Sequence, residues 1–358
     1  MRKLYYAFTQ LHLLYLVNMR LTVHKKCQVD LIILNTNHTG CDRLIEKIKE
    51  KKVFDKILLL ENHRKHENGI KKISGVIKEM QTAKKNKAII SSFLSDQINE
   101  YDELFTFGSN MEAYIAYDII SKGRNVSFNY YEEGIGTYVH PITNMLRPWY
   151  RWFLNINRIH MPSYPNEVWV YMPDWLSKEI SEYAEVKQMP EIDSIDTIND
   201  IWDYNSIAIN ERAVLFEQPL DEQEQVLSDL FHCFDLNEAI VKLHPRTEST
   251  ELFNDMKIME SNNTIWELIC LNNQLDDKLL VTYCSTACFT PRYLSNSEPS
   301  IIFLFNMDEL KGKISSRMEE LVEKLQESYS NSGTIYLPKN REEYLLAIQT
   351  FFKMNNTR

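Results

Sequence analysis

The chain has 358 residues, of which 44% are hydrophobic and 25% charged, and its formal net charge at pH 7 is −10. Disordered chains lack this apolar content, and a chain of this length exceeds one ordinary hydrophobic core, so we expect two globular domains. Broad nucleic-acid binding requires a basic surface, so the acidic balance argues against a nucleic-acid partner.

Apolar runs alternate with amphipathic stretches along the first half of the sequence, which predicts strands alternating with helices. The predicted strands are 3–10, 29–37, 56–62, 101–110 and 125–134. The predicted helices are 11–21, 41–52, 69–86 and 111–123, the last of them ended by Gly123. Because the strand runs are largely apolar, we expect a parallel sheet covered by helices on both faces.

A second series of the same kind follows an acidic, weakly periodic stretch. Its predicted strands are 212–220, 238–246, 278–286 and 300–306, and its predicted helices are 222–236, 264–273, 287–296 and 340–354. The sequence therefore predicts a two-lobed α/β enzyme with a cleft between the lobes. We expect an N-terminal domain over 1–190, a linker over 191–205, a C-terminal domain over 206–338, and a final helix within 339–358 that packs back on the N-terminal domain.

The cysteines and the N-terminal segment indicate the compartment. The six cysteines are scattered without a CxxC pair, so neither a disulfide framework nor a zinc site is expected, and a reducing compartment fits. The N-terminal run resembles a signal peptide, but Thr9, Gln10 and His12 interrupt it and no cleavage site follows. No stretch of about 18 apolar residues occurs, so we expect no membrane span and predict a cytoplasmic protein.

Two segments suit a membrane surface as well as ordinary structural roles. Residues 43–87 hold fourteen Lys and Arg against six Asp and Glu, which is typical of solvated helix faces but also suits anionic lipid. Residues 147–153, RPWYRWF, mix arginine with aromatic residues, as in packed cores or interfacial anchors. Peripheral contact with the inner face of the cell membrane therefore stays open, as does a homodimer.

Polar clusters follow several predicted strands at the point where each strand ends. In open α/β sheets, ligands bind at the carboxyl ends of the strands, so this shared placement predicts a ligand site. The residues concerned are Thr9, Gln10 and His12; Ser109 and Asn110; Glu132, Glu133 and Gly134; His244, Pro245 and Arg246; and Ser285 and Thr286.

The segment NYYEEGIGTY, residues 129–138, holds two carboxylates followed by two of the nine glycines in the chain. Gly134 allows a positive φ, so the strand is expected to turn tightly behind Glu132 and Glu133. Adjacent carboxylates raise each other's pKa, which would suit one of them to accept a proton. The alternative interpretation is a strand end whose charges face solvent before a glycine turn.

The segment VKLHPR ends a predicted strand with a histidine and an arginine, and Pro245 restricts the backbone between them. A cationic pair suits a phosphate group, and a protonated His244 would stabilise a departing phosphate. A loop histidine beside a surface arginine, Arg246, is the plainer interpretation.

The segment YCSTACF places two hydroxyl groups between a strand and a helix. Ser285 and Thr286, with the backbone N–H groups of the helix start, would hold a phosphate; an ordinary N-cap serine is the alternative. Glu267 lies near the start of the 264–273 helix, where it would accept hydrogen bonds from a ribose or simply interact with the helix dipole.

No D-x-D triplet occurs in the chain, and neither a G-x-x-x-x-G-K-[ST] nor a G-x-G-x-x-G motif is present. Enzymes that bind nucleotide diphosphates through a metal often use paired acids of the D-x-D kind. The sequence therefore favours a mechanism without metal or other cofactor, in which polar and cationic side chains neutralise the phosphate.

Together, these clusters resemble the bacterial sialyltransferases of glycosyltransferase family 52, the lipooligosaccharide and capsule sialyltransferase family. That family shares an acid-acid-Gly motif, a His-Pro motif and a later Ser/Thr pair, matched in the same order by 132–134, 244–245 and 285–286. The segment AFTQLHLL resembles the family's opening strand and turn, although Gln10 stands where the family has proline. The resemblance extends over 5–305.

The resemblance implies a GT-B fold, with two Rossmann-like lobes that bind acceptor mainly on the first and CMP-sialic acid on the second. It implies inversion without a metal, with Glu133 as the base and His244 assisting the departing CMP. The remaining expected roles are orientation of the base by Glu132, donor binding by Gly134, Pro245, Arg246, Glu267, Ser285 and Thr286, and acceptor binding by Thr9, Gln10, His12, Ser109 and Asn110.

Several alternatives stay open at this point. Asp221 also follows a strand of the second lobe and competes with Glu133 as the base. The chain could use another nucleotide-activated sugar, or be an inactive nucleotide-sugar-binding partner in capsule assembly. The sequence leaves open whether the acceptor is a terminal galactoside or a sialoside, whether it is lipid-linked, which linkage forms (2,3, 2,6 or 2,8), and whether one residue or a polymer is added.

Overall fold

The structure is a computed structural model that describes residues 1–35, 42–61, 73–108, 110–139, 148–218, 223–244, 247, 250–260, 264–310 and 314–355. The chain divides into two compact units, Met1–Tyr204 and Asn205–Arg358. The division falls within the predicted 191–205 linker.

The first unit is built on a parallel sheet, seven-stranded over the described residues, with the order β3-β2-β1-β4-β5-β6-β7. Its strands are β1 (Arg2–Ala7), β2 (Gln28–Asn35), β3 (Lys56–Glu61), β4 (Tyr101–Thr106), β5 (Ser127–Tyr131), β6 (Glu167–Val170) and β7 (Glu185–Gln188). The five longer strands match the predicted ones. Strands β6 and β7 were not predicted, because they are short and β7 has no fully buried residue.

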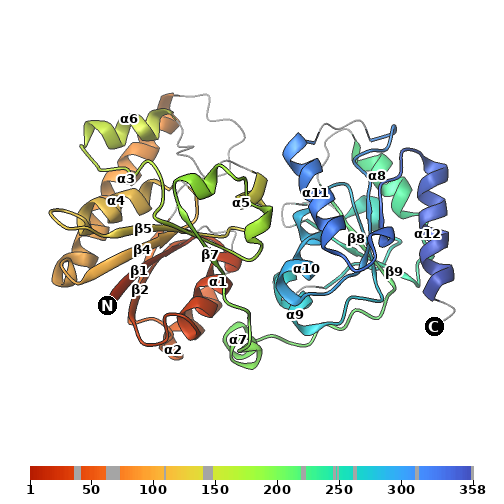
Figure 1. Ribbon diagram of the computed structural model, residues 1–358, viewed down its shortest axis with the longest axis horizontal. Coiled ribbons are helices and arrows are strands. Elements are labelled where there is room, and N and C mark those ends of the chain that lie inside the picture. Colours follow the sequence, from red (N-terminus) through yellow and green to blue (C-terminus); the bar gives the residue numbers. More distant parts are fainter. Residues whose placement is uncertain are drawn as a thin grey trace. The chain divides into compact units, whose positions relative to one another are not determined.

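Helices cover both faces of this sheet, as the apolar strands require. They are α1 (Gln10–Leu21), α2 (Asp42–Glu50), α3 (Ile73–Leu94), α4 (Met111–Ile120), α5 (Gly136–Val139), α6 (Pro148–Ile156) and α7 (Ile195–Trp202). Helices α3, α4 and α6 lie on one face, and α1, α2 and α7 lie on the other (Figure 1). Helices α1 and α4 are buried along nearly their whole length, which places them at the centre of these layers.

Helix α7 lies in the segment that the sequence predicted to be a linker. Its Ile198 and Ile201 are buried, and it contacts α1 and α2. Just after it, Asp203 forms ion pairs with Arg43 and Lys47 of α2, at 2.7 and 3.1 Å. Two buried isoleucines and these ion pairs make the helix a folded part of the first unit, so the connection between the units is shorter than predicted.

The second unit contains a parallel sheet, five-stranded over the described residues, with the order β12-β11-β10-β8-β9. Its strands are β8 (Ala213–Phe216), β9 (Ala239–Lys242), β10 (Leu279–Thr282), β11 (Ser300–Phe303) and β12 (Ile335–Tyr336). Its helices are α8 (Glu224–Phe231), α9 (Trp266–Asn272), α10 (Thr290–Ser295), α11 (Ser316–Ser328) and α12 (Arg341–Asn355). Strands β8, β10 and β11 are buried throughout, which explains why their sequences are almost entirely apolar.

The C-terminal helix α12 packs on its own unit, and the predicted packing on the N-terminal domain stays a prediction. Tyr344 is fully buried, and its hydroxyl donates to the carbonyl oxygen of Leu230 on α8 at 2.9 Å. Helices α8 and α12 lie on one face of the sheet, and α9 and α10 on the other (Figure 1).

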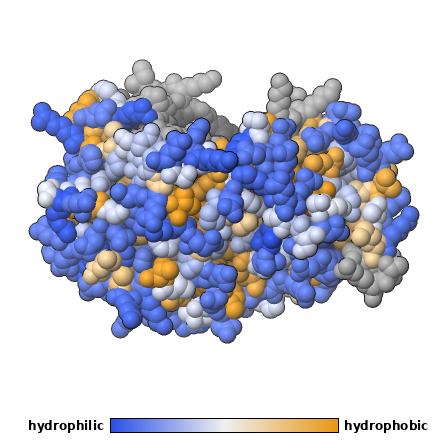
Figure 2. Space-filling view, in the orientation of Figure 1, coloured by the Kyte–Doolittle hydropathy of each residue, from blue (hydrophilic) through white to orange (hydrophobic). Residues whose placement is uncertain are grey.

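Over the described ranges, none of the helices has the length and apolar character needed to cross a membrane. The face of the molecule in Figure 2 is mostly hydrophilic, with apolar side chains in scattered groups. The described cysteines (Cys27, Cys233, Cys270, Cys284 and Cys288) are all free thiols.

Candidate active site

In the first unit, the carboxyl ends of β1, β4 and β5 lie side by side, because these strands are neighbours in the sheet. The chain leaves β1 toward β2 on one side, and β4 lies on the other side. This reversal of strand order is where open α/β sheets usually bind ligands. The predicted polar clusters of the first unit follow these three strands, so the fold brings them to one edge.

Glu133 follows β5, and its carboxylate is half-buried between two glycines. A Cβ atom added to Gly136 would lie 3.3 Å from Glu133 Oε1, and one added to Gly108, after β4, would lie 4.0 Å from the same oxygen. The backbone N–H of Glu133 donates to Thr137 Oγ1 at 2.9 Å, which fixes the turn. Burial raises the pKa of the Glu133 carboxyl above its ordinary value, which makes it a better proton acceptor when ionised.

Gly134 adopts the left-handed backbone conformation that the turn behind Glu133 requires. Its φ of +91° is strained for any residue with a side chain, and a Cβ atom there would lie 3.4 Å from Leu11 Cδ2 on α1. The start of α1 therefore approaches the Glu-Glu-Gly turn closely.

Glu132, the first residue after β5, has no exposed surface. Its Oε2 accepts hydrogen bonds from the hydroxyl of Tyr138 at 2.5 Å and from the backbone N–H of Tyr171, after β6, at 2.8 Å. The Tyr138 hydroxyl in turn accepts from the N–H of Met172 at 3.0 Å. Glu132 therefore ties the Glu-Glu-Gly turn to the next strand.

The raised pKa values of the two acids have a different cause from the one that their adjacency predicted. Burial raises the pKa of Glu132 to about 8, against the opposing effect of its hydrogen bonds to Tyr138 and Tyr171. Burial also raises the pKa of Glu133. Desolvation therefore dominates the pKa of each acid, and the expected mutual repulsion does not.

The predicted residues at the start of α1 form a helix cap. Thr9 Oγ1 accepts from the N–H of His12 at 3.2 Å, and His12 Nδ1 lies 3.3 Å from the N–H of Thr9, which completes a capping box. Burial lowers the pKa of His12 to about 3, so this ring is neutral, and it packs against Phe107 with ring centroids 3.7 Å apart. Gln10 is the first residue of the helix.

Asn110 is the N-cap residue of α4, and its side-chain amide donates to the carbonyl oxygen of Phe107. Phe107 therefore contacts the start of α1 through His12 and the start of α4 through Asn110.

In the second unit, the carboxyl ends of β9, β8 and β10 lie side by side, with β8 in the middle. His244 follows β9 and is half-buried. Its backbone N–H donates to Glu217 Oε2 at 2.7 Å, and the hydroxyl of Thr247 donates to the same oxygen. The N–H of Thr247 donates to the carbonyl oxygen of His244 at 2.9 Å and closes the turn.

Ser285 follows β10 and caps the short 3₁₀ turn Thr286–Cys288, with its hydroxyl accepting from the N–H of Ala287 at 3.3 Å. Ser285 is half-buried and Thr286 is exposed, so both hydroxyl-bearing residues are accessible. The N–H of Ser285 donates to Thr282 Oγ1 at 2.8 Å.

Glu267 lies in the first turn of α9, where burial raises its pKa. The cation of Lys242, the last residue of β9, acts in the opposite direction on that carboxyl, and burial lowers the pKa of Lys242. The preceding residue, Trp266, donates from Nε1 to the carbonyl oxygen of Ala287 at 2.8 Å. The helix that carries Glu267 thus contacts the turn that carries Thr286.

Four predicted site residues lie outside the described ranges: Ser109, Pro245, Arg246 and Asp221. Sequence reasoning also missed Glu217 and Gln218, which hold the second-unit turns, and Lys242, which interacts with Glu267. Their position at the carboxyl ends of β8 and β9 is the same strand-end signal that identified His244 and Ser285.

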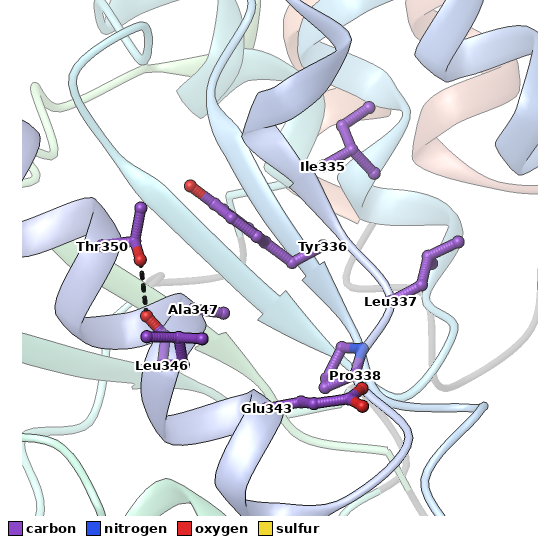
Figure 3. Close-up of a pocket in the computed structure, with 8 residues that line it drawn as sticks. All are labelled: Ile335, Tyr336, Leu337, Pro338, Glu343, Leu346, Ala347 and Thr350. Atoms are coloured by element: carbon purple, nitrogen blue, oxygen red, sulfur yellow. Dashed lines mark hydrogen bonds between the residues drawn. The ribbon is translucent and has the colours of Figure 1, made fainter.

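A pocket of about 350 Å³ lies between β12 and α12 of the second unit (Figure 3). None of the predicted site residues lines it. Its lining is mainly apolar and consists of Ile335, Tyr336, Leu337, Pro338, Glu343, Leu346, Ala347 and Thr350. The carboxylate in this lining, Glu343, accepts a hydrogen bond from the backbone N–H of Lys339 at the start of α12, and no predicted site residue lies beside it, so we separate the pocket from the candidate active site.

The model of the alpha-2,8-polysialyltransferase (POLYST) family matches residues 3–301. No curated protein matches the chain significantly.

Among solved structures, LpCGTa in complex with UDP has a TM-score of 0.53 and 9% identity, covering 98% of this chain and 90% of that chain. Arabidopsis thaliana UGT89C1 in complex with UDP-L-rhamnose has a TM-score of 0.52 and 8% identity, covering 99% and 93%. A UDP-glucosyltransferase from Polygonum tinctorium has a TM-score of 0.51 and 9% identity, covering 99% of both chains. These similarities confirm the predicted GT-B fold, with a parallel-sheet α/β lobe in each unit.

Proposed function

The chain belongs to the alpha-2,8-polysialyltransferase family, and on that premise we propose that it is an inverting, metal-independent sialyltransferase. It would transfer sialic acid from CMP-sialic acid to a hydroxyl group of a bacterial surface glycan. Membership of a sialyltransferase family agrees with the predicted kind of enzyme. The assignment to glycosyltransferase family 52 is part of the proposal and rests on the motifs at 132–134, 244–245 and 285–286.

The observation that carries this proposal is the position of Glu133. Its carboxylate lies at the carboxyl end of a central strand, half-buried between Gly108 and Gly136, with a pKa raised by burial. In the proposed step, Glu133 takes the proton of the acceptor hydroxyl while that oxygen forms a bond to the anomeric carbon of sialic acid. The bond from that carbon to the phosphate oxygen of CMP breaks on the opposite face, which inverts the configuration.

The second unit would bind the donor. His244 would stabilise or protonate the departing phosphate, Ser285 and Thr286 would hold it, and Glu267 would accept hydrogen bonds from the ribose. Support for this comes from the shared edge of the sheet, where the ends of β9 and β10 are neighbours of β8. The absence of a D-x-D triplet in the sequence supports the metal-free part.

The family description favours one of the two acceptor classes left open by the sequence. We propose a sialoside acceptor and a 2,8 linkage, with repeated addition producing a polymer. The residues around Phe107, which include Thr9, Gln10, His12 and Asn110, would border the acceptor because they share the sheet edge with Glu133. A homodimer and a lipid-linked acceptor remain predictions.

We further propose a cytoplasmic enzyme that touches the inner face of the cell membrane through α6. This helix exposes Trp152 and Ile156, one helical turn apart, to 55% and 58%, and Arg151 and Arg158 beside them are exposed. Trp152→Ala with Ile156→Ala should reduce binding to vesicles containing phosphatidylserine. Equal binding by the variant and by the unchanged protein would remove α6 as the contact.

The test of the proposed activity is incubation of the purified protein with CMP-sialic acid and either a galactoside or an oligosialoside acceptor. We expect release of CMP and elongation of the oligosialoside by 2,8-linked residues, seen by mass spectrometry and linkage analysis. Transfer only to galactosides would correct the acceptor class. Inactivity toward CMP-sialic acid, with turnover of another nucleotide sugar, would overturn the proposal.

A further inference from the structure

Two adjacent residues at the end of β8 reach to different neighbouring loops. Strand β8 lies between β9 and β10, so its carboxyl end faces the His244 turn on one side and the Ser285 turn on the other. Glu217 contacts the first turn and Gln218 contacts the second. Neither residue belongs to the motifs on which the proposed function rests.

Glu217 is 6% exposed, and one of its carboxylate oxygens accepts two hydrogen bonds from the His244 turn. The donors are the N–H of His244, at 2.7 Å, and the hydroxyl of Thr247. The N–H of Glu217 donates to the carbonyl oxygen of Lys242 at 3.0 Å, which continues the pairing of the two strands. Glu217 therefore holds both Lys242 at the end of β9 and the start of the His244 turn, and hydrogen bonds to a carboxylate are the stronger kind.

Gln218 uses an uncharged acceptor for the other turn. Its Oε1 accepts from the N–H of Cys284 at 2.8 Å and from the hydroxyl of Thr282 at 3.0 Å. Thr282 Oγ1 in turn accepts from the N–H of Ser285 at 2.8 Å. Two successive hydrogen bonds, through Thr282, therefore lead from Gln218 to Ser285, the residue that would hold the phosphate, without placing a negative charge beside it.

We propose that Glu217 and Gln218 are paired positioning residues of the donor site. Glu217 fixes the His244 turn, Gln218 fixes the Ser285 turn, and their adjacency just after β8 sets the distance between the two donor-binding groups. The inference rests on the proposed function, because it assigns the two turns to one phosphate. Neither residue needs to touch the substrate.

The expected effects follow from misplacing groups that act in the transition state. A shift of about 1 Å costs on the order of 10²-fold in rate. Glu217→Ala should therefore lower kcat by about 10- to 100-fold with a smaller change in CMP affinity, and Glu217→Gln should recover most of the loss because its amide oxygen still accepts. Gln218→Ala should mainly raise the KM for CMP-sialic acid, because the phosphate-holding turn is loosened.

The decisive experiment is a pair of double-mutant cycles on the full chain with CMP-sialic acid. If Glu217 acts through His244, Glu217→Ala combined with His244→Ala should be no slower than His244→Ala alone, within about threefold. Gln218→Ala with Ser285→Ala should behave in the same way for donor KM. Multiplicative losses in both cycles would overturn the inference, since independent structural damage adds in free energy.

The matched control is Glu211→Gln. Glu211 is also 6% exposed, but it precedes β8 at the opposite end and pairs with Lys257. Glu211→Gln should lower the free energy of unfolding, but it should change kcat and the KM for the donor much less than Glu217→Ala does. Equal kinetic losses in Glu211→Gln and Glu217→Ala would contradict a specific positioning role.

Replacement variants and amide hydrogen exchange allow the inference to be tested even if a variant does not fold or the enzyme does not turn over. Thr247→Val and Gln218→Met replace Glu217→Ala and Gln218→Ala if those variants do not fold, because both change the side-chain volume little. Thr247→Val removes one of the two hydrogen bonds to Glu217 Oε2, and Gln218→Met removes both hydrogen bonds that Gln218 Oε1 accepts. Amide hydrogen exchange at His244 and Ser285 should become faster in the respective variants whether or not the enzyme turns over. Faster exchange without any wild-type transfer would reject the proposed function, whereas wild-type transfer with unchanged exchange would reject the positioning role.

Discussion

Glu132 gives the most direct physical prediction, because it is a fully buried acid with a pKa of about 8. Glu132→Gln removes the ionisable group and keeps the side-chain shape. The amide oxygen still accepts from Tyr138 and Tyr171, and the amide nitrogen replaces Oε1, which has no hydrogen-bond partner in the structure. The substitution should therefore stabilise the protein at neutral pH rather than damage it.

The magnitude follows from proton linkage. The carboxyl titrates near 4.5 when unfolded and near 8 when folded, so the folded state holds its proton more tightly. The stabilising contribution is full below pH 4.5 and is lost as pH rises toward 8, at about 1.4 kcal/mol per pH unit. The glutamine variant has no such dependence. The two proteins should be similar near pH 4.5, and the variant should be more stable by about 3 kcal/mol at pH 7.

Urea unfolding of both proteins between pH 5 and 9 measures this difference. The gap between the free energies of unfolding should widen with pH and level off above pH 8. Glu211→Gln should lose stability instead, because it breaks the ion pair with Lys257. A constant loss of stability for Glu132→Gln at every pH would mean that Glu132 is buried as a carboxylate, which would refute the reasoning.

The remaining predictions concern the reaction. Glu133→Gln should keep CMP binding and lower the transfer rate by at least about 100-fold, whereas Asp221→Asn stays near wild type; the reverse result would move the base to the second unit. His244→Ala should cost about 10²- to 10³-fold in kcat with a smaller loss of CMP affinity by calorimetry, and near-normal turnover would exclude it from leaving-group stabilisation. Gly136→Ala should fold but lower kcat, since the new Cβ would lie 3.3 Å from Glu133 Oε1; unchanged kcat would show that the carboxylate moves freely. Excess EDTA should leave CMP binding and transfer unchanged, and restoration by Mg²⁺ of activity lost to EDTA would contradict the metal-free proposal.

Local patterns in the sequence were sufficient to predict most of the fold. The apolar runs at β1, β2, β8 and β10 identify buried parallel strands, since each is too apolar for a strand with one solvated face. Strand β12 has only two residues, β6 alternates buried with half-buried residues, and β7 has no fully buried residue, so none of them contains the continuous apolar run that identifies the equally short strands β8 and β10. Helix α11 was also missed, although its buried residues repeat with helical spacing.

The site was predictable only in the residues that follow strands. Glu133, His244 and Ser285 lie where the strand-end rule places them. The roles of Glu217 and Gln218 could not be predicted, because they depend on β8 lying between β9 and β10, and strand order is a long-range property. The sequence also gave no sign of which adjacent acid is buried.

The two glycines behind the paired acids serve different physical needs, which explains why such a glycine-poor chain places them together. Gly134 supplies a φ of +91° and lets the turn pass Leu11, while Gly136 leaves space for the carboxylate of Glu133. Glu132 is fixed by Tyr138 and Tyr171 and anchors the turn. Glu132 is therefore held in place, and Glu133 is oriented toward the edge of the sheet where the strands end. A larger residue at 134 would strain the turn, whereas a larger residue at 136 would contact the Glu133 carboxylate, so each change would disturb the orientation of Glu133 for a different reason.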